Sequence, residues 1–379
     1  MIPPLDLKAA ATELQPELEA VFRRFLESGR YVLGPETDAF EEEYAAYCRA
    51  DHCVGVSSGL DALHLALRAA GIGAGDEVIV ASNTYIATWL AVTHAGAAVV
   101  PAEPDPATHN LDPDCISACI TPRTKAVLAT SLYGQPVDYD RIRQITDSSG
   151  LLFLTDSAQA NGACFGDRPV GGLADMECHS FYPTKNLGAM GEAGAVTTSN
   201  PEFARRIRLL RNYGSEQRYQ HQTPGFNCRI DELQAGLLRV RLRYLDDWNA
   251  RRRTIASVYS ESLAACSDLT LPHEADGTTH AWHQYVIRSD RRDQLQQDLK
   301  ENGIITLIHY PVPPHQSEAY RFAGFPSDQF PIANELAASV LSLPMSPHLA
   351  KDDALQVAET ILRVIRQRDD DRKSEYRAA

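Results

Sequence analysis

The stretch CVGVSSGLDALHLALRAA, residues 53–70, contains the pattern that decides the fold. Its first part, residues 53–58, is a short run with β-branched residues, which is typical of a buried strand. From Gly59 onward the apolar residues recur at helical spacing, at Leu60, Leu63, Leu67 and Ala70. A strand is therefore predicted to lead directly into a helix.

The same pattern repeats along the first two thirds of the chain. Further strand candidates are EVIVAS (77–82), AVLAT (126–130), LLFLTD (151–156) and AVTTS (195–199). Helical stretches follow at 87–94 and 138–146, and FARRIRLLRNY begins just after the last of these strands. Apolar strands that alternate with helices predict an α/β domain, with a mostly parallel mixed sheet covered by helices on both faces.

The pattern of predicted helices and strands changes after Asp247. An Arg-rich helix, the run WHQYVIRS (282–289), a helix over 291–302 and a long final helix over 352–366 indicate a smaller α+β domain. The chain has 379 residues, which exceeds the roughly 250–300 residues that one core supports. We therefore predict a large domain over 1–247, with an N-terminal helical segment, and a small C-terminal domain over 248–379.

The charge balance excludes some classes of partner. Acidic residues outnumber basic ones by 50 to 36, for a net charge of -14, whereas a general nucleic-acid binder usually has a basic excess. An anionic substrate would need a locally basic pocket. No apolar run approaches the length that spans a bilayer, so no membrane partner is expected. We expect a cytoplasmic protein.

Two residues suggest the chemistry of a site. Asp156 ends a buried apolar strand, where a bare carboxylate is costly unless a cation pairs with it. Lys185 lies in the mostly uncharged, aromatic and glycine-rich stretch SFYPTKNLG (180–188). Such surroundings lower the pKa of a lysine, and a neutral amine is what Schiff-base formation requires.

A third element completes this site. Free N–H groups and the helix dipole at the junction of residues 57–60 could hold a phosphate. Lysine, carboxylate and phosphate cradle together predict pyridoxal 5'-phosphate. GIGAGDE (71–77) follows a helix and precedes a strand, the reverse of a dinucleotide-binding context, so an NAD enzyme is disfavoured. No metal site is expected.

At these residues the chain resembles the DegT/DnrJ/EryC1/StrS family of sugar aminotransferases. The resemblance extends over nearly the whole chain, through SSGLDALHLALRA, SNTYIATWLAVTHAG, LYGQP, DSAQANGA, SFYPTKNLGAMGEAGAV, LRNYGS, GFNCRIDELQAG and IHYPVPPHQSEAY. It implies the type I fold of pyridoxal phosphate-dependent transferases. It also implies an aminotransferase, because Lys185 stands where the family's dehydratases have histidine.

The resemblance implies roles for individual residues. Lys185 would form the Schiff base and Asp156 would pair with the pyridine nitrogen. The other cofactor contacts would be the backbone N–H groups of Gly59 and Leu60, the stacked ring of Tyr85, and the side chains of Gln159 and Ser180. Asn227 would reach the cofactor of the neighbouring subunit, which implies a homodimer with shared sites. Asn161 and Glu192 depart from the family's usual pattern and could alter the pocket wall.

The resemblance also implies the substrates, L-glutamate and a nucleotide-linked keto-sugar. Tyr182, His309 and Tyr310 would line the sugar and diphosphate site, with Arg218 donated across the dimer. LYGQP, RNYGS and IHYP look more like members that aminate C3 of a dTDP-linked 3-keto-6-deoxyhexose than members that aminate C4. Amination at C4, a keto-inositol substrate and a non-catalytic regulatory role remain alternatives.

Overall fold

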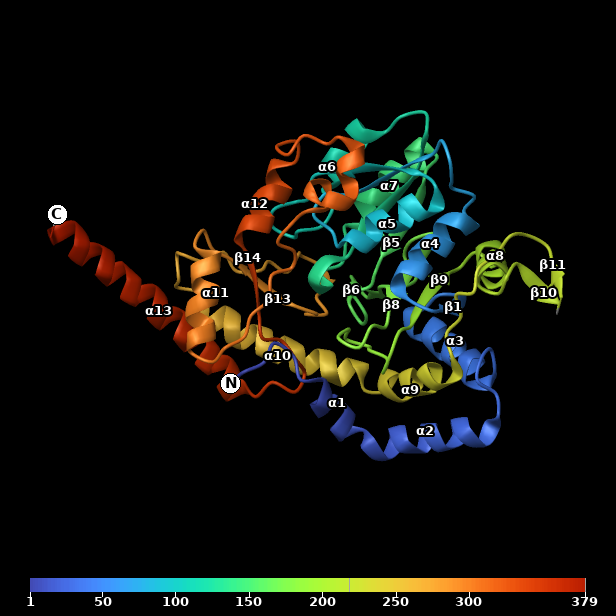
Figure 1. Cartoon of the computed structure of the whole chain (residues 1–379), viewed down its shortest axis with the longest axis horizontal. Coiled ribbons are helices and arrows are strands. Elements are labelled where there is room, and N and C mark those ends of the chain that lie inside the picture. Colours follow the sequence, from blue (N-terminus) through green and yellow to red (C-terminus); the bar gives the residue numbers. More distant parts are fainter. Residues whose placement is uncertain (218, 379) are drawn as a thin grey trace.

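A seven-stranded sheet forms the centre of the molecule (Figure 1). The computed structural model describes residues 1–217 and 219–378, with side chains up to residue 368. Across the sheet the strands are β1 (His52–Val56), β9 (Gly194–Thr198), β8 (Met176–Ser180), β5 (Leu152–Asp156), β4 (Thr124–Thr130), β2 (Glu77–Ala81) and β3 (Ala98–Ala102). Only β9 runs antiparallel to its neighbours within this sheet. The predicted mostly parallel mixed sheet is confirmed.

Helices cover both faces of this sheet because its strands are apolar on both sides. In β2, Val78 and Val80 pack into one cluster with α4 (Gly59–Ala69), α5 (Ile86–Ala95) and α8 (Pro201–Arg211). Ile79 and Ala81 pack into another cluster on the opposite face, with α6 (Pro113–Ile116) and α7 (Tyr139–Ser149). The alternation follows from the period of two along a strand. The two-face covering of the prediction is confirmed.

A third cluster extends the second face toward the N-terminus. It joins α3 (Pro35–Cys48) to α9 (Glu232–Leu242) beneath β1 and β9. Before α3 come α1 (Leu7–Glu13) and α2 (Gln15–Ser28), which packs along α9. The short strands lie in small separate sheets: β6 (Cys164–Phe165), β7 (Arg168–Pro169) and β12 (Thr278–Thr279) in one, and β10 (Ser215–Gln217) and β11 (Gln220–His221) in the other.

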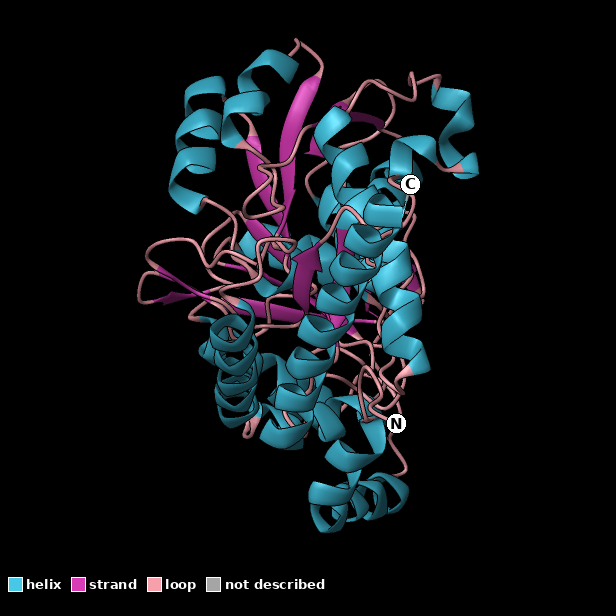
Figure 2. Ribbon diagram, turned by 90° about the vertical axis from the view of Figure 1, so that its left-hand side faces the viewer, coloured by secondary structure: helices cyan, strands magenta, loops and turns pink. Residues whose placement is uncertain are grey.

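The C-terminal part has its own hydrophobic cluster. Here β13 (Tyr285–Arg288) pairs with β14 (Val340–Leu343), and α11 (Arg292–Glu301) and α13 (Lys351–Ala378) belong to the same cluster, whereas α12 (Pro331–Ser339) packs in a separate cluster with Tyr133. Helix α10 (Leu245–Leu263) begins in the third cluster and ends in this one. The long α13, which leads to the C-terminus marked in Figure 2, crosses the front of that view, and α10 packs against it. Residue 247 therefore lies inside α10, and the division into 1–247 and 248–379 stays a prediction.

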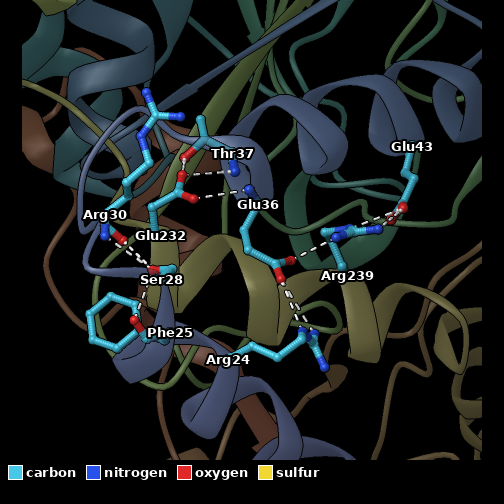
Figure 3. A network of polar contacts seen from close by, with 9 residues as sticks. All are labelled: Arg24, Phe25, Ser28, Arg30, Glu36, Thr37, Glu43, Glu232 and Arg239. Carbon is cyan, nitrogen blue, oxygen red and sulfur yellow. Dashed lines mark hydrogen bonds and ion pairs between the residues drawn. The ribbon is translucent and has the colours of Figure 1, made fainter.

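A polar network fixes the turn between α2 and α3 against α9 (Figure 3). The Glu232 carboxylate accepts the backbone N–H groups of Gly34, Glu36 and Thr37 at 2.8–2.9 Å. A Cβ on Gly34 would lie 2.7 Å from Glu232 Oε2, so glycine is required for this approach. Arg239 of α9 also pairs with Glu36. These contacts attach the turn between α2 and α3 to α9.

Within the described part of the chain, no helix combines the length and the apolar composition that a membrane span needs.

Candidate active site

A cavity of about 490 Å³ opens at the carboxyl ends of β4, β5 and β8, next to the N-terminus of α4. In α/β sheets this edge is the usual place for a ligand. Loops from the C-terminal part complete its wall. Its lining contains these predicted site residues: Gly59, Leu60, Tyr85, Asp156, Gln159, Ser180, Tyr182, Lys185, His309 and Tyr310. Ten of the twelve predicted residues are thus gathered around one space.

Asp156 is a buried carboxylate at the end of β5. Its Oδ2 accepts a hydrogen bond of 2.8 Å from the Thr88 hydroxyl, and its Oδ1 accepts the Ala158 N–H at 3.2 Å. Burial raises the pKa of Asp156, although these two hydrogen bonds and the charge of Lys185 oppose the change. A cation that entered the cavity beside Asp156 would be stabilised by the carboxylate.

Lys185 is held in a turn that follows β8. Its backbone N–H donates to the Tyr182 carbonyl at 2.8 Å. Burial lowers the pKa of Lys185 to about 8, and the nearby Asp156 opposes this change. A substantial fraction of the amine is therefore neutral near physiological pH, and only a neutral amine is nucleophilic.

A buried amide network holds the residue next to Lys185. Asn186 Nδ2 donates to the Ala281 carbonyl at 2.7 Å and to Asn249 Oδ1 at 2.8 Å. Asn186 Oδ1 lies 3.1 Å from Nδ1 of His283, a cavity-lining residue. Burial holds the pKa of His283 well below its usual range, so this imidazole is neutral. The residue that follows Lys185 is thus fixed by buried partners.

The start of α4 forms the predicted phosphate cradle. Ser58 caps the helix, and the first intrahelical bond runs from Ala62 N–H to the Ser58 carbonyl at 2.9 Å. The N–H groups of Gly59 and Leu60 precede that bond and are available to a ligand. A Cβ on Gly59 would lie 2.6 Å from Ser180 Cβ. Glycine therefore lets the helix N-terminus approach the Ser180 hydroxyl.

Gln159 connects the sheet edge to the C-terminal wall. Its Nε2 donates to the Tyr310 hydroxyl at 3.1 Å, and its Oε1 accepts the Tyr133 N–H at 2.6 Å. The rings of Tyr85 and Tyr310 lie 5.0 Å apart. Tyr85 is half exposed and lines the cavity, so its ring is accessible to a planar group.

His309 and Tyr182 both line the cavity. His309 Nδ1 lies 2.8 Å from the Ser342 hydroxyl of β14, and the Tyr133 hydroxyl donates to the His309 carbonyl. Burial and the charge of Lys185 lower the pKa of His309 to about 4, so the ring is neutral. Tyr182 is about half exposed at the rim. Both positions suit contact with a substrate that enters from solvent.

One predicted residue does not line this cavity, and another is not described by the structure. Asn227 is exposed, forms a β-bridge with Asn212 and does not line the cavity. Arg218 lies outside the described residues. The predicted contributions of both across a dimer stay predictions.

Sequence reasoning missed several residues of the site. Thr88 binds Asp156, and His283 and Gln284 line the cavity. Gln284 Oε1 is buried and has no hydrogen-bond partner among the described residues. The helical spacing of Thr88 after Tyr85 was a usable signal, because both face the same side of α5. No spacing or motif in the sequence marks His283 and Gln284 as site residues. They lie just before the short strand β13 and outside the helical stretches.

The two departures from the family pattern lie in different places. Asn161 is buried and accepts a hydrogen bond of 2.8 Å from the Tyr44 hydroxyl, so it supports the core. Glu192 lines the cavity beside the Lys185 loop. Only Glu192 alters the pocket wall.

The residues of this cavity fit pyridoxal phosphate. The buried Asp156 carboxylate needs a cationic partner, and the absence of a Cβ at Gly59 keeps the N–H groups at the start of α4 close to the Ser180 hydroxyl. The amine of Lys185 has a pKa near physiological pH. Asp156 and Lys185 would hold the ring nitrogen and the aldehyde, and Gly59, Leu60 and Ser180 would hold the phosphate.

Comparison with known proteins defines the class. Residues 12–362 match the DegT/DnrJ/EryC1/StrS aminotransferase family. Erythromycin biosynthesis sensory transduction protein EryC1 of Saccharopolyspora erythraea is 52% identical over 360 residues, which are 95% of this chain and 98% of that protein. A dTDP-3-amino-3,4,6-trideoxy-alpha-D-glucose transaminase of Streptomyces venezuelae is 51% identical, with 95% of each chain covered.

Solved structures agree with this result. The crystal structure of S. venezuelae DesV matches with a TM-score of 0.94 at 51% identity, covering 95% of this chain and 97% of that chain. NtdA of Bacillus subtilis with bound cofactor PMP matches with a TM-score of 0.86 at 30% identity, covering 93% and 82%. The fold is thus that of the aminotransferases. The chain belongs to the DegT/DnrJ/EryC1/StrS aminotransferase family. The predicted family, enzyme class and type of cofactor are confirmed.

Proposed function

We propose that this chain transfers the amino group of L-glutamate to C3 of a dTDP-linked 3-keto-6-deoxyhexose. The observation that carries the proposal is the meeting of Lys185, Asp156 and the α4 N-terminus around one cavity. Pyridoxal phosphate, when bound, supplies a carbonyl that takes up the amino group and a ring that accepts electrons.

Lys185 moves the proton in both halves of the reaction. Its Nζ, neutral in part near physiological pH, accepts the proton from the donor's α-carbon and later returns a proton to the sugar carbon. The fixed neighbour Asn186 keeps the lysine turn in one position, so the amine does not need to be reoriented between the two steps.

Asp156 supplies the fixed negative charge. The Thr88 hydroxyl and the Ala158 N–H hold the carboxylate in place at the sheet edge. A preorganised carboxylate in a buried site keeps a ring nitrogen protonated, at no cost of reorganisation during the reaction. Asp156 thus keeps the ring able to accept electrons, while Lys185 accepts and returns the proton.

The choice of sugar rests on the relatives and on the wall of the cavity. The S. venezuelae relative is named for a sugar with its amino group at C3. His309, Tyr310 and Gln284 offer polar groups to a hydroxylated ring at the C-terminal wall. Arg218 would contact the diphosphate, and a keto-inositol would not require it. Amination at C4 is the alternative within this enzyme class.

A regulatory role is the alternative outside it. The S. erythraea relative carries the name of a sensory transduction protein. The intact lysine, carboxylate and phosphate cradle support catalysis instead, because a binding scaffold has no need of an amine with a lowered pKa.

We also propose a cytoplasmic homodimer in which Asn227 and Arg218 of one copy reach the site of the other. An apolar groove between α2 and α9 supports a second copy as the occupant of this face, with Phe22, Leu26 and Met190 exposed along it. Met190 belongs to the loop that carries Lys185, and its N–H donates to Gln234 of α9 at 2.8 Å. A copy seated there would therefore lie next to the active site.

Amino transfer by two lysine variants tests the proposed function. Lys185→Ala should abolish both glutamate deamination and sugar amination, whereas Lys125→Ala, which removes an exposed lysine on β4, should leave both intact. Transfer by Lys185→Ala at the wild-type rate would contradict the assignment. Arg218→Ala should raise KM for the nucleotide sugar and spare glutamate, and equal damage to both would contradict its proposed contact.

A further inference from the structure

A second, much smaller cavity lies behind the loop that carries Lys185. It measures about 30 Å³ and is separated from the active site by Thr184 and Lys185, which line both spaces. Its other walls come from the N-terminal segment, from α9 and α10, and from the loop after β14, where Ser346 and His348 lie. No residue of these other walls takes part in the proposed reaction.

Two buried guanidinium groups line this cavity. Arg241 is 5% exposed and Arg252 is 3% exposed. Arg241 donates to the Gly188 carbonyl. Arg252 donates to the carbonyls of Trp282, His283 and Met345 at 3.2–3.4 Å. Within the described side chains, neither forms an ion pair with a carboxylate, so both cations are paired only with neutral acceptors.

Three polar atoms around the cavity are buried without a hydrogen-bond partner. They are Arg241 Nε, Arg252 Nε and His348 Nδ1, a statement that covers the described residues. The other nitrogen of His348, Nε2, lies 2.6 Å from Glu13 and is already engaged. Arg241, Arg252 and His348 thus line the same small space, and the two arginines each bring an unpartnered N–H donor on a cation.

Burying two positive charges together is unfavourable. An uncompensated charge in a protein interior costs several kcal/mol, and two like charges also repel each other. Burial lowers the pKa of Arg252 to about 9 and also lowers that of Arg241, yet both stay protonated at neutral pH. Asp6 is the carboxylate at the cavity wall, but it is exposed and its Oδ1 caps α1 by accepting the N–H groups of Lys8 and Ala9.

We propose that this cavity is a binding site for a small monoatomic anion, chloride under physiological conditions, held by Arg241 Nε and Arg252 Nε. The volume decides the class of ligand. A cavity of about 30 Å³ exceeds the roughly 10–15 Å³ that one water-sized sphere requires. This volume suits one small ion better than a phosphate, a nucleotide or the carbon chain of an amino acid.

The anion would connect segments that are distant in sequence. Arg241 is anchored to Gly188 in the loop that carries Lys185, and Arg252 is anchored to His283, which lines the active site. An anion between the two guanidinium groups would lock α9 and α10 together behind Lys185. It would act on the position and stability of this loop, without contact to substrate.

Bromide-substituted crystals of the cofactor-loaded enzyme test the proposal directly. Bromide replaces chloride in such sites and is located by its anomalous scattering. We expect an anomalous peak within hydrogen-bond distance of both Nε atoms. Density for ordered water alone, or no anomalous peak, would overturn the proposal, since water would then satisfy the donors.

Thermal unfolding gives a second readout in solution. At constant ionic strength, replacement of methanesulfonate, which is too large for the cavity, by chloride should raise the melting temperature. The rise should be roughly 2 °C for each tenfold increase in chloride above the dissociation constant. No chloride-specific rise in the wild type would overturn the proposal.

Matched arginine variants locate the effect. Arg241→Gln should lose the bromide peak and the chloride-specific rise. Arg243→Gln removes the same charge from the exposed side of the same helix end and should keep both. An unchanged chloride response in Arg241→Gln would overturn the proposal. If that variant does not fold, the bromide experiment on the wild-type enzyme still decides.

Discussion

The hydroxyl of Thr88 donates a hydrogen bond of 2.8 Å to Oδ2 of Asp156. Thr88 belongs to α5 and Asp156 to β5, so this bond fixes the buried carboxylate from the neighbouring βα unit. Burial raises the pKa of Asp156, and the bond from Thr88 is the largest contribution that opposes it. The charge on Asp156 therefore depends on a residue that does not itself need to touch a substrate.

Thr88→Val should weaken catalysis by changing the pKa of Asp156. A hydrogen bond to a charged group contributes about 1.5–3 kcal/mol, so its loss raises the pKa of Asp156 and lowers kcat/KM by about tenfold or more. The acid limb of the pH–rate profile should move to higher pH. Thr93→Val, on the same helix but bonded to Trp89 and Tyr320, should leave the profile unchanged. An unshifted acid limb in Thr88→Val would argue against this role.

Asp156→Asn should lower kcat more than the loss of the hydrogen bond from Thr88 does. The substitution keeps the shape of the side chain and removes the negative charge that faces the cavity, so kcat should fall by at least about a hundredfold. Asp138→Asn is a suitable control because Asp138 caps α7, and asparagine caps helices equally well. Steady-state kinetics of both variants measure the difference. Near-normal turnover by Asp156→Asn would refute the proposed pairing with a ring nitrogen.

Gly59→Ala should weaken cofactor binding. The added Cβ would lie 2.6 Å from Ser180 Cβ, so the start of α4 or the end of β8 must move and the cradle loses its geometry. We expect the dissociation constant of the cofactor to rise about tenfold or more, as measured by titration of the apoprotein. Gly73→Ala places its Cβ 3.5 Å from the nearest atom and should bind normally. Equal affinity of the two variants for the cofactor would contradict the proposed role of Gly59 in phosphate binding.

Lys185→Met should stabilise the apoprotein at neutral pH. The pKa of Lys185 is 10.5 in an unstructured chain and about 8 in the folded protein. Below pH 8 both states bind the proton, so the full burial penalty, up to about 3 kcal/mol, is present. Between pH 8 and 10.5 the unfolded chain binds more protons, so wild-type stability rises with pH. Urea unfolding should show a gap between variant and wild type that narrows over this range, and a gap independent of pH would contradict the assigned pKa.

The arrangement of the large sheet and the centre of the site could be predicted from the sequence. Apolar strands alternating with helices predict a parallel sheet, and the carboxyl ends of parallel strands meet at one edge. Asp156 ends one of the predicted strands, whereas β8, which ends at Ser180 beside β5, is not among the predicted strands, and its place next to Asp156 comes from the structure. The motifs supplied the rest of the inner wall, including Gln159 and Tyr85.

Contacts between distant segments could not be predicted in this way. The network of Asn186, Asn249 and His283 joins residues that are 63 and 97 positions apart, and no local periodicity encodes such pairs. The run Arg251, Arg252 and Arg253 resembles a solvated helix face. The structure buries Arg252 because that position faces the C-terminal cluster, whereas Arg251 pairs with Glu13 nearer the surface.

The fate of the glutamate nitrogen tests the central claim most directly. The enzyme is incubated with ¹⁵N-labelled L-glutamate and, in separate reactions, with a dTDP-linked 3-keto and a dTDP-linked 4-keto 6-deoxyhexose, and the sugar products are analysed by NMR. We predict ¹⁵N bonded to C3 of the sugar from the 3-keto substrate, with 2-oxoglutarate as co-product. Label at C4, or no label in either sugar from enzyme that binds the cofactor, would contradict the proposed function.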